Sequence, residues 1–452
     1  MKKSNKKNNK KQNKINMNKS KKHKNIIKTK KRNLNTNKKA DGFLNKLFPK
    51  NINIKTVVIK DTTPFEDRLI SKHIHNVVKR GESTDSSKFT KNKSFSPQVN
   101  KRLASINTNI EHNDIFGCGI NTPLKNKQFK PNVTRKKKSL FNNNILVKIG
   151  MKNNNPICVN KNDPRAQKIL LDNLNLSRFI DCNNIVPPLQ IRANCWFNTM
   201  FVCFFISDKG RKFFKFFRQL MIQGKLQDGR NITPKQLADS FFLFNAAIEA
   251  SYSSTKNINS KDLALSMDTN NIITRIYNSI PKNKRGTGIL DVDSPNNPLI
   301  YYKDIINYLG NNSINLSEIY YSEFQRLKSI TNNGTSFSKL PDVYAVILTD
   351  EMSKNIKNRP IIIKLQGVEY ILDSAIIRDT EKYHFCAVLT CGGKELGFDG
   401  ASMSRLNKFE WKKYINTNRN WTFEGSNFNE DKKNPILWNF RKGYQILFYY
   451  RN

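Results

Sequence analysis

The sequence predicts an α+β fold, with helices first and an antiparallel sheet afterwards, behind a basic leader. Apolar residues follow a helical spacing through much of residues 170–249, whereas after Lys339 they fall into short runs typical of strands. Residues 1–150 hold 38 basic and 8 acidic residues, about +30 of the net charge of +44. Because 37% of the residues are apolar, with 29 Phe and 14 Tyr, the chain has enough material for a core, and disorder throughout is excluded.

Residues 1–154 are predicted to be a basic, mostly disordered leader. No acidic residue precedes Asp41, and residues 1–40 consist mainly of Lys, Asn, Ser and isolated Ile without a helical or strand period. Such a segment cannot bury enough apolar area to offset its ordering entropy. Its unpaired Lys residues can neutralise phosphates, so we expect non-specific nucleic acid binding. The alternative is that the charge only keeps the chain soluble or reflects codon use.

The sequence also bounds where the protein works. No apolar run approaches the roughly 18 residues needed to span a bilayer, and the N-terminus has no apolar signal segment. We therefore expect a cytoplasmic protein without a membrane partner, and the basic leader leaves the nucleus open. The excess of Asn, Lys and Ile suggests an AT-rich genome, as in some large DNA viruses.

The seven cysteines are an odd number, and no two have the C-x-x-C spacing of a zinc knuckle. Without an export signal, reduced thiols are expected, and neither a metal nor a cofactor is predicted.

The body, residues 155–452, is predicted to open with helices. Helical spacing is found at Leu170–Phe179 and at Phe197–Gln223. A further helix is expected at residues 233–249, where Thr233 and Pro234 provide an N-cap and a first-turn proline. Residues 253–299 are polar and punctuated by Gly and Pro, which predicts a loop excursion.

Strands are predicted in the last quarter of the chain. The runs are Val343–Leu348, Pro360–Leu365, Glu369–Ile377, Phe385–Thr390 and Tyr444–Tyr450.

The histidines narrow the search for chemistry. Four of the five lie in the predicted leader, so His384 is the body's single histidine. It opens the strand beginning at Phe385, and a Gly-Gly turn joins that strand to a second one ending near Asp399. A hairpin of this length makes His384 and Asp399 cross-strand neighbours, within reach of a carboxylate–imidazole hydrogen bond. The competing interpretation is an ordinary surface or core histidine.

Cys195 is the candidate nucleophile. It follows the irregular segment that contains Pro187 and Pro188, and a helix is expected to begin at or just after it. The positive end of the helix dipole and the free N–H groups there favour a thiolate, and the same N–H groups, with a side-chain amide upstream, can form an oxyanion hole. Cys203 lies two turns into the helix among apolar residues and is interpreted as core.

These segments resemble the ubiquitin-specific proteases. Residues 190–201, QIRANCWFNTMF, are similar to the Cys box of that family, and residues 383–400, YHFCAVLTCGGKELGFDG, are similar to its His box. Three weaker matches follow in the family's order: the strand opened by Leu340-Pro341, the strand at 369–377 and the terminal GYQILFYYR. The resemblance covers about residues 155–452.

The resemblance implies a papain-like cysteine protease fold, with a helical lobe carrying Cys195 and an antiparallel sheet lobe carrying His384 and Asp399. It implies hydrolysis of the bond after the C-terminal Gly of ubiquitin or a ubiquitin-like protein. Cys195 would be the nucleophile, His384 its proton partner, Asp399 the residue that orients the imidazole, and Gln190 an oxyanion donor. Two positions depart from the family: Tyr383 replaces the Gly before the His, and Gln190 replaces an Asn. The family's zinc-binding fingers are absent from the sequence.

Two other functions fit the same residues. One is a cysteine protease that processes a polyprotein. The other is a basic nucleic-acid-associated or virion protein with an inactive protease-like body, which the leader and Tyr383 favour.

Overall fold

The computed structural model describes the body with short gaps, together with parts of the predicted leader. The described residues are 56–60, 118, 146–153, 155–175, 180–190, 192–252, 263–264, 267–292, 294, 296–310, 314–332, 340–356, 358–381, 384–402, 405–427 and 435–452. Tyr383 and residues 253–262 therefore lie outside the described residues.

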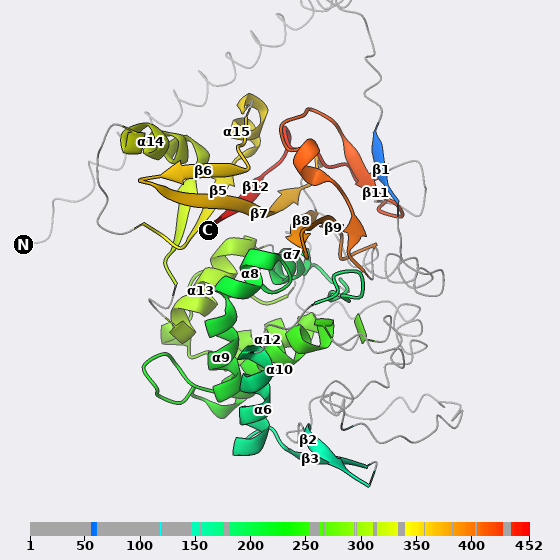
Figure 1. The fold of residues 1–452 in the computed structure, drawn as a ribbon, viewed down its shortest axis with the longest axis vertical. Coiled ribbons are helices and arrows are strands. Elements are labelled where there is room, and N and C mark those ends of the chain that lie inside the picture. Colours follow the sequence, from blue (N-terminus) through cyan, green and yellow to red (C-terminus); the bar gives the residue numbers. More distant parts are fainter. Residues whose placement is uncertain are drawn as a thin grey trace, which may run out of the picture. The chain divides into compact units, whose positions relative to one another are not determined.

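An eight-stranded sheet organises the second half of the chain (Figure 1). Its order is β10-β9-β8-β7-β12-β5-β4, and β6 pairs with β7 beside β8. The strands are β4 Leu316–Tyr320, β5 Val343–Leu348, β6 Ile362–Leu365, β7 Val368–Arg378, β8 Phe385–Cys391, β9 Lys394–Phe398, β10 Asn407–Lys408 and β12 Gln445–Arg451. All pairs are antiparallel except β4 with β5, which run parallel. The five predicted strands are confirmed, each within two residues at either end.

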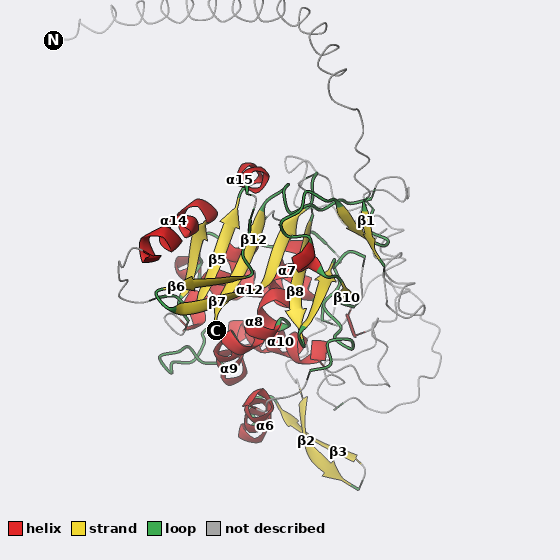
Figure 2. Cartoon of the chain, turned by 45° about the horizontal axis from the view of Figure 1, so that its top comes forward, coloured by secondary structure: helices red, strands yellow, loops and turns green. Residues whose placement is uncertain are grey.

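The described helices fall into two groups. The α-helices are α6 Pro164–Asn175, α7 Cys195–Phe205, α8 Asp208–Phe213, α9 Lys215–Gln223, α10 Lys235–Tyr252, α12 Thr269–Ser279, α13 Pro298–Gly310, α14 Tyr321–Asn332 and α15 Asp350–Asn355. Two 3₁₀ turns are η2 Lys282–Lys284 and η3 Trp411–Lys413. Helices α7 to α13 lie on one side of the sheet and α14 and α15 on the other (Figures 1 and 2). The predicted α+β class is confirmed.

Both faces of the sheet are buried, as β5 demonstrates. Residues 343, 345 and 347 belong to the core that includes α7, and residues 344, 346 and 348 belong to a second core with Phe324 of α14. Successive side chains of a strand point to opposite faces, so a strand covered on both sides is apolar at every position. This explains the unbroken run VYAVIL.

The helix predicted at 197–223 is three helices, α7, α8 and α9. The Ser207 hydroxyl accepts a hydrogen bond from the Gly210 N–H at 3.1 Å, which caps a new helix. A Cβ at Gly210 would lie 2.2 Å from the Cys203 carbonyl oxygen, so only glycine allows this close approach.

The predicted loop excursion at 253–299 is wrong for residues 269–279, which form α12. The side chains of Ile272, Ile273 and Ile276 are buried, and Asp268 caps the helix by accepting from the Asn271 N–H at 3.2 Å. The polar residues between these isoleucines face away from the core, which is the pattern of an amphipathic helix.

Two small sheets lie wholly or partly within the predicted leader. β1 (Val57–Ile59) pairs in parallel with β11 (Trp421–Phe423), and β2 (Leu146–Lys152) pairs with β3 (Asn155–Asn160). Within the mostly disordered leader that the sequence predicts, β1 and β2 are therefore ordered strands. The domain boundary at 154/155 stays a prediction, although β2 and β3 lie on either side of it.

The expectation of reduced thiols is wrong for four cysteines. Cys118 is bonded to Cys158, and Cys182 to Cys391. The second pair is 209 residues apart in sequence, so only the fold brings the two sulfurs together. Within the described part of the chain, Cys195, Cys203 and Cys386 are free.

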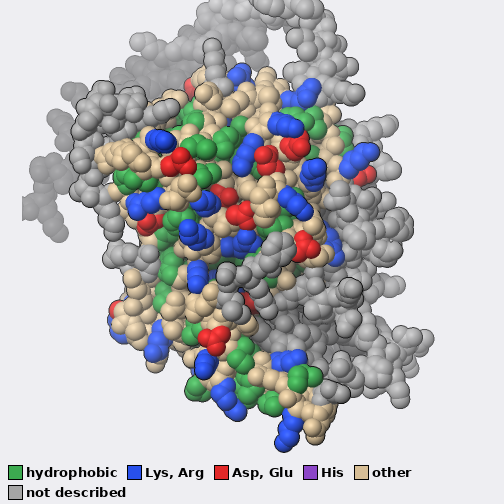
Figure 3. Space-filling model, viewed as in Figure 1, with side chains coloured by type: hydrophobic (Ala, Val, Ile, Leu, Met, Phe, Trp, Pro, Cys, Tyr) green, Lys and Arg blue, Asp and Glu red, His purple; other side chains and the backbone are tan. Residues whose placement is uncertain are grey.

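One face of the molecule is mixed in charge. On the face shown in Figure 3, Lys and Arg side chains are interspersed with Asp and Glu instead of forming a single patch. Among the described helices, none has both the length and the apolar character needed to cross a bilayer.

Candidate active site

Cys195 is the first residue of α7, as the sequence predicts. Its thiol is free and its residue is only 8% exposed. The Asn194 carbonyl accepts the N–H groups of Phe197 and Asn198, each at 3.1 Å, so the helix begins at the cysteine itself. The thiol therefore lies at the positive end of an eleven-residue helix.

A buried hydrogen-bond chain fixes the start of α7 against α12. The Asn194 Nδ2 donates to Thr269 Oγ1 at 2.8 Å, and Thr269 Oγ1 donates to Asn198 Oδ1 at 2.9 Å. Asn194, Asn198 and Thr269 are 2% exposed or less. Because residues 253–299 are predicted as loop, no sequence pattern indicates the role of Thr269.

Gln190 lies five residues before Cys195 and is fully buried. Its backbone N–H donates to the Gly400 carbonyl at 2.8 Å, directly beside Asp399. This bond joins the loop that precedes α7 to the loop that follows β9. The structure thus brings the Gln190 backbone next to the segment that carries Asp399.

His384 and Asp399 form the hydrogen bond that the hairpin predicts. The Nε2 of His384 lies 2.6 Å from Asp399 Oδ1, with both side chains buried. They are not direct cross-strand neighbours, however. Ala387 pairs with Phe398, so the register carried one residue further sets Asp399 opposite Cys386. The turn after Asp399 and the loop before β8 bring the two side chains together.

Opposing effects act on the pKa of the His384 imidazole. Burial lowers it, but the charge and hydrogen bond of Asp399, and then the hydrogen bond and charge of Cys195, raise it well above its usual value. Burial raises the pKa of Asp399, but the charge and hydrogen bond of His384 and hydrogen bonds from Ser402 and Ser426 outweigh it, so the pKa is lowered. Both neighbours favour the protonated ring, so the His384–Asp399 pair favours imidazolium with carboxylate.

The Asp399 carboxylate is surrounded by donors. Oδ1 accepts from the Ala401 N–H at 3.0 Å as well as from His384. Oδ2 accepts from the Ser402 hydroxyl at 2.6 Å and from the Ser426 hydroxyl. These donors compensate for the cost of burying a charge, and the sequence did not reveal Ser402 or Ser426.

The backbone of His384 is held by Asp379. The His384 N–H donates to Asp379 Oδ1 at 2.6 Å, and the Asp379 N–H donates to the His384 carbonyl at 2.8 Å. Asp379 Oδ2 also accepts from the Glu381 N–H at 2.9 Å. These bonds join Asp379 to His384 and so fix the position of the His384 backbone from which the imidazole extends.

The remaining cysteines fit no nucleophilic role. Cys203 and Cys386 are fully buried, and burial raises the pKa of both thiols. The interpretation of Cys203 as core is confirmed. Cys391 is in a disulfide and has no free thiol.

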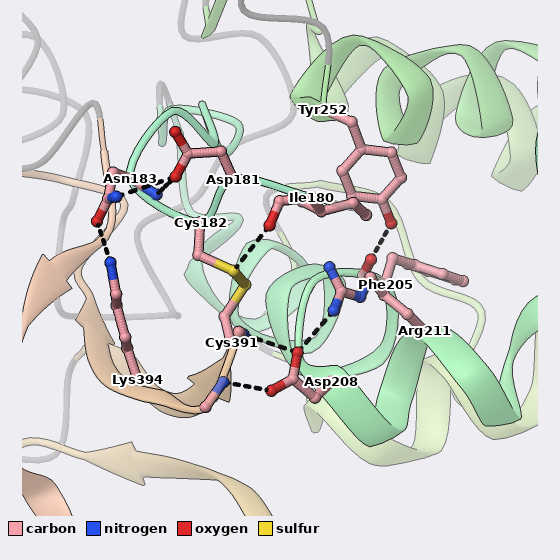
Figure 4. The surroundings of a disulfide bond; sticks show 12 residues. Ile180, Asp181, Cys182, Asn183, Phe205, Asp208, Arg211, Tyr252, Cys391 and Lys394 are labelled. Carbon is pink, nitrogen blue, oxygen red and sulfur yellow. Dashed lines mark hydrogen bonds and ion pairs between the residues drawn. A yellow bond between two sulfur atoms is a disulfide. The ribbon is translucent and has the colours of Figure 1, made fainter. Parts of the chain in front are cut away.

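The disulfide Cys182–Cys391 holds the turn after β8 (Figure 4). Beside it, Asp208 accepts from the N–H groups of Gly392 and Gly393 at 2.8 and 3.0 Å, and Arg211 pairs with the same carboxylate. A covalent bond and a carboxylate clamp therefore fasten the His384 hairpin to the helical half of the body.

No group of three or more His, Cys, Asp or Glu side chains that could hold a metal occurs among the described residues.

No protein-family model and no curated protein matches the sequence. Solved structures do match at low similarity. One is the SAGA Ubp8/Sgf11/Sus1/Sgf73 DUB module bound to ubiquitin aldehyde, with 11% identity and a TM-score of 0.38 over 64% of this chain and 75% of that one. The Ubp8-Sgf11-Sgf73-Sus1 SAGA DUB module has 10% identity and a TM-score of 0.35, and the match covers 65% of this chain and 76% of that one. An essential yeast splicing factor has 10% identity and a TM-score of 0.34, and the match covers 62% of this chain and 75% of that one. Such values assign no family, so the function is argued from the site.

Proposed function

We propose that the protein is a papain-like cysteine hydrolase that cleaves peptide or isopeptide bonds. The observation that carries this proposal is the buried hydrogen bond between His384 and Asp399, with Cys195 near enough to raise the pKa of the imidazole. A thiol at a helix start, next to an imidazole that a carboxylate orients, is the arrangement that nucleophilic catalysis by cysteine requires.

The chemistry follows from the atoms. The Asp399 carboxylate holds Nε2–H of His384, so the other ring nitrogen, Nδ1, is the one free to exchange a proton with Cys195 in the proposed reaction. Cys195 attacks the substrate carbonyl as thiolate, and the imidazolium then gives its proton to the leaving amine. Water hydrolyses the resulting thioester, with the imidazole as base.

The oxyanion site is proposed from the Cys195 backbone N–H and the Gln190 side-chain amide. Removing one such donor costs about 3–4 kcal/mol in the barrier. The bond from Gln190 N–H to the Gly400 carbonyl supports this role, because it anchors Gln190 beside the Asp399 segment.

The proposed substrate is a conjugate of ubiquitin or a ubiquitin-like protein, cut after its C-terminal Gly. The support is the resemblance of residues 190–201 and 383–400 to the boxes of the ubiquitin-specific proteases. Processing of a polyprotein and an inactive, nucleic-acid-associated body are the alternatives.

Ubiquitin carrying a C-terminal electrophile tests the proposal. The wild-type chain should become covalently labelled at Cys195, and Cys195→Ala should lose the label. Cys203→Ala is the matched control, since this thiol is fully buried eight residues along the same helix, and it should keep the label.

The other outcomes separate the alternatives. A folded wild-type protein without label, whose Cys195 still reacts rapidly with iodoacetamide, would point to a different protein substrate. Absence of both reactions would identify an inactive body and contradict the proposal.

A further inference from the structure

We propose that Ser426 is a positioning residue for the reaction, acting through Asp399; this inference rests on the proposed function. Ser426 lies 27 residues after Asp399, and its hydroxyl donates to Asp399 Oδ2. It is 1% exposed. No sequence motif indicates it.

Ser426 differs from the local donors to Asp399. Ala401 and Ser402 belong to the turn that Asp399 itself begins, in which the Ser402 N–H donates to the Asp399 carbonyl at 3.3 Å. An aspartate often bonds to such a turn for backbone reasons alone. Among the described residues, Ser426 and His384 are the donors that reach this carboxylate from elsewhere in the chain. They bind different oxygens, so together they set the direction of the carboxylate plane.

The backbone of Ser426 is held on both sides. The Ser426 N–H donates to the Phe423 carbonyl at 3.1 Å, and the Ser426 carbonyl accepts from the Ile436 N–H at 2.9 Å. Nearby, Trp421 and Trp438 exchange two backbone hydrogen bonds of 2.9 Å. We call residues 421–427 and 435–438 the β11 hairpin.

The β11 hairpin also backs the imidazole. The Trp438 ring is stacked on Trp421 at 5.4 Å, and its centroid lies 6.0 Å from that of His384. Residues far from both sequence boxes therefore contact each member of the His384–Asp399 pair.

Loss of this hydroxyl has a definite consequence. A buried carboxylate needs its acceptor sites filled. With Ser426 removed, Oδ2 keeps Ser402 alone, and the carboxylate can rotate so that Oδ1 leaves His384 Nε2. The Ser402 and Ser426 oxygens lie 2.6 Å apart, so the two hydroxyls share one oxygen and their removal should be non-additive.

The experiment measures the rate at which iodoacetamide alkylates Cys195 in the full chain, identified by peptide mass. This reaction depends on the thiolate that the imidazole stabilises, and it needs no ubiquitin. Ser426→Ala should lower the rate about tenfold, the size expected for one hydrogen bond to a charged group. Ser402→Ala combined with Ser426→Ala should lower it more than the product of the single effects.

Ser240→Ala is the matched control. Ser240 is fully buried, and its hydroxyl donates to the Gln236 carbonyl within α10, so its loss should leave alkylation unchanged. If Ser426→Ala does not fold, Ser426→Cys keeps the shape with a weaker donor and should still slow the reaction.

The outcomes distinguish this inference from the proposed function. Rapid alkylation in wild type and an equal rate in folded Ser426→Ala and Ser426→Cys would overturn the role of Ser426. A slowed variant in a protein that the ubiquitin electrophile does not label would retain the inference and refute the ubiquitin substrate.

Discussion

Asp373 on β7 gives the protein a pH dependence that is separate from its chemistry. The residue is 3% exposed and its Oδ2 accepts from the Lys209 N–H at 3.0 Å. Burial raises the pKa of the Asp373 carboxyl to about 6, although hydrogen bonds from Ser207 and Lys209 act in the opposite direction. An Asp in the unfolded chain has a pKa of about 4, so the folded state binds this proton more tightly. The stability from Asp373 is therefore complete below about pH 4 and is lost as the pH rises through about 6.

Asp373→Asn should remove this dependence. We expect the stability of the variant relative to wild type to increase by about 2–3 kcal/mol between pH 4 and pH 7.5. Urea unfolding of both proteins across this range measures it. A difference that stays constant with pH would show that Asp373 is ionised at no cost in the fold.

The residues of the candidate site were visible in the sequence to different degrees. Cys195 and His384 each lie in a local pattern, a helix start and a strand start, so sequence alone placed them. The hydrogen bond between His384 and Asp399 was predictable from the hairpin, although the register was not. Ser426 was not predictable, because its role depends on a contact made through tertiary packing.

At the scale of elements, β1 pairs with the β11 hairpin, although its residues precede the predicted body in the sequence. The Val57 N–H donates to the Asn420 carbonyl at 3.0 Å, and the Ile59 carbonyl accepts from the Glu424 N–H at 2.9 Å. Ile59 is 5% exposed, whereas Val58 is 56% exposed. The strand thus buries the Ile59 side chain against the core and leaves the Val58 side chain exposed.

This alternation gives a matched pair of variants. Ile59→Asp should lower the free energy of unfolding by about 3 kcal/mol, because it buries a charge without a partner. Val58→Asp should change it by about 0.5 kcal/mol or less. Thermal unfolding compares them, and equal effects would show that β1 does not pack as described.

Sequence predicted some elements better than others for physical reasons. Strands β5 and β12 are apolar at nearly every position, so they stand out. Helix α12 was missed because its three core isoleucines are separated by polar residues within a segment rich in Gly and Pro. Strands β1 and β11 span three residues each, and the paired residues Val57 and Trp421 lie 364 positions apart, so no local period marks either strand.

At the scale of the whole molecule, the uneven charge yields a prediction about polyanions. Residues 1–55 contain 20 basic residues and one acidic residue. Binding to duplex DNA should be independent of sequence, with dissociation constants on the order of 10⁻⁴–10⁻⁶ M at physiological salt and a steep salt dependence.

Comparison of the full chain with residues 56–452 measures this contribution while keeping β1. The shorter chain should bind DNA more weakly, with a shallower salt dependence, and should keep its reactivity at Cys195. Unchanged DNA affinity would move the binding site into the body.

The disulfide Cys182–Cys391 has a topological consequence. Cys182 precedes Cys195, and Cys391 follows His384, so the crosslink encloses both reactive residues within one covalent ring. A single proteolytic cut between residues 196 and 383 would place the thiol and the imidazole on separate polypeptides. Under oxidising conditions the two pieces would remain one molecule, and reduction alone would release them.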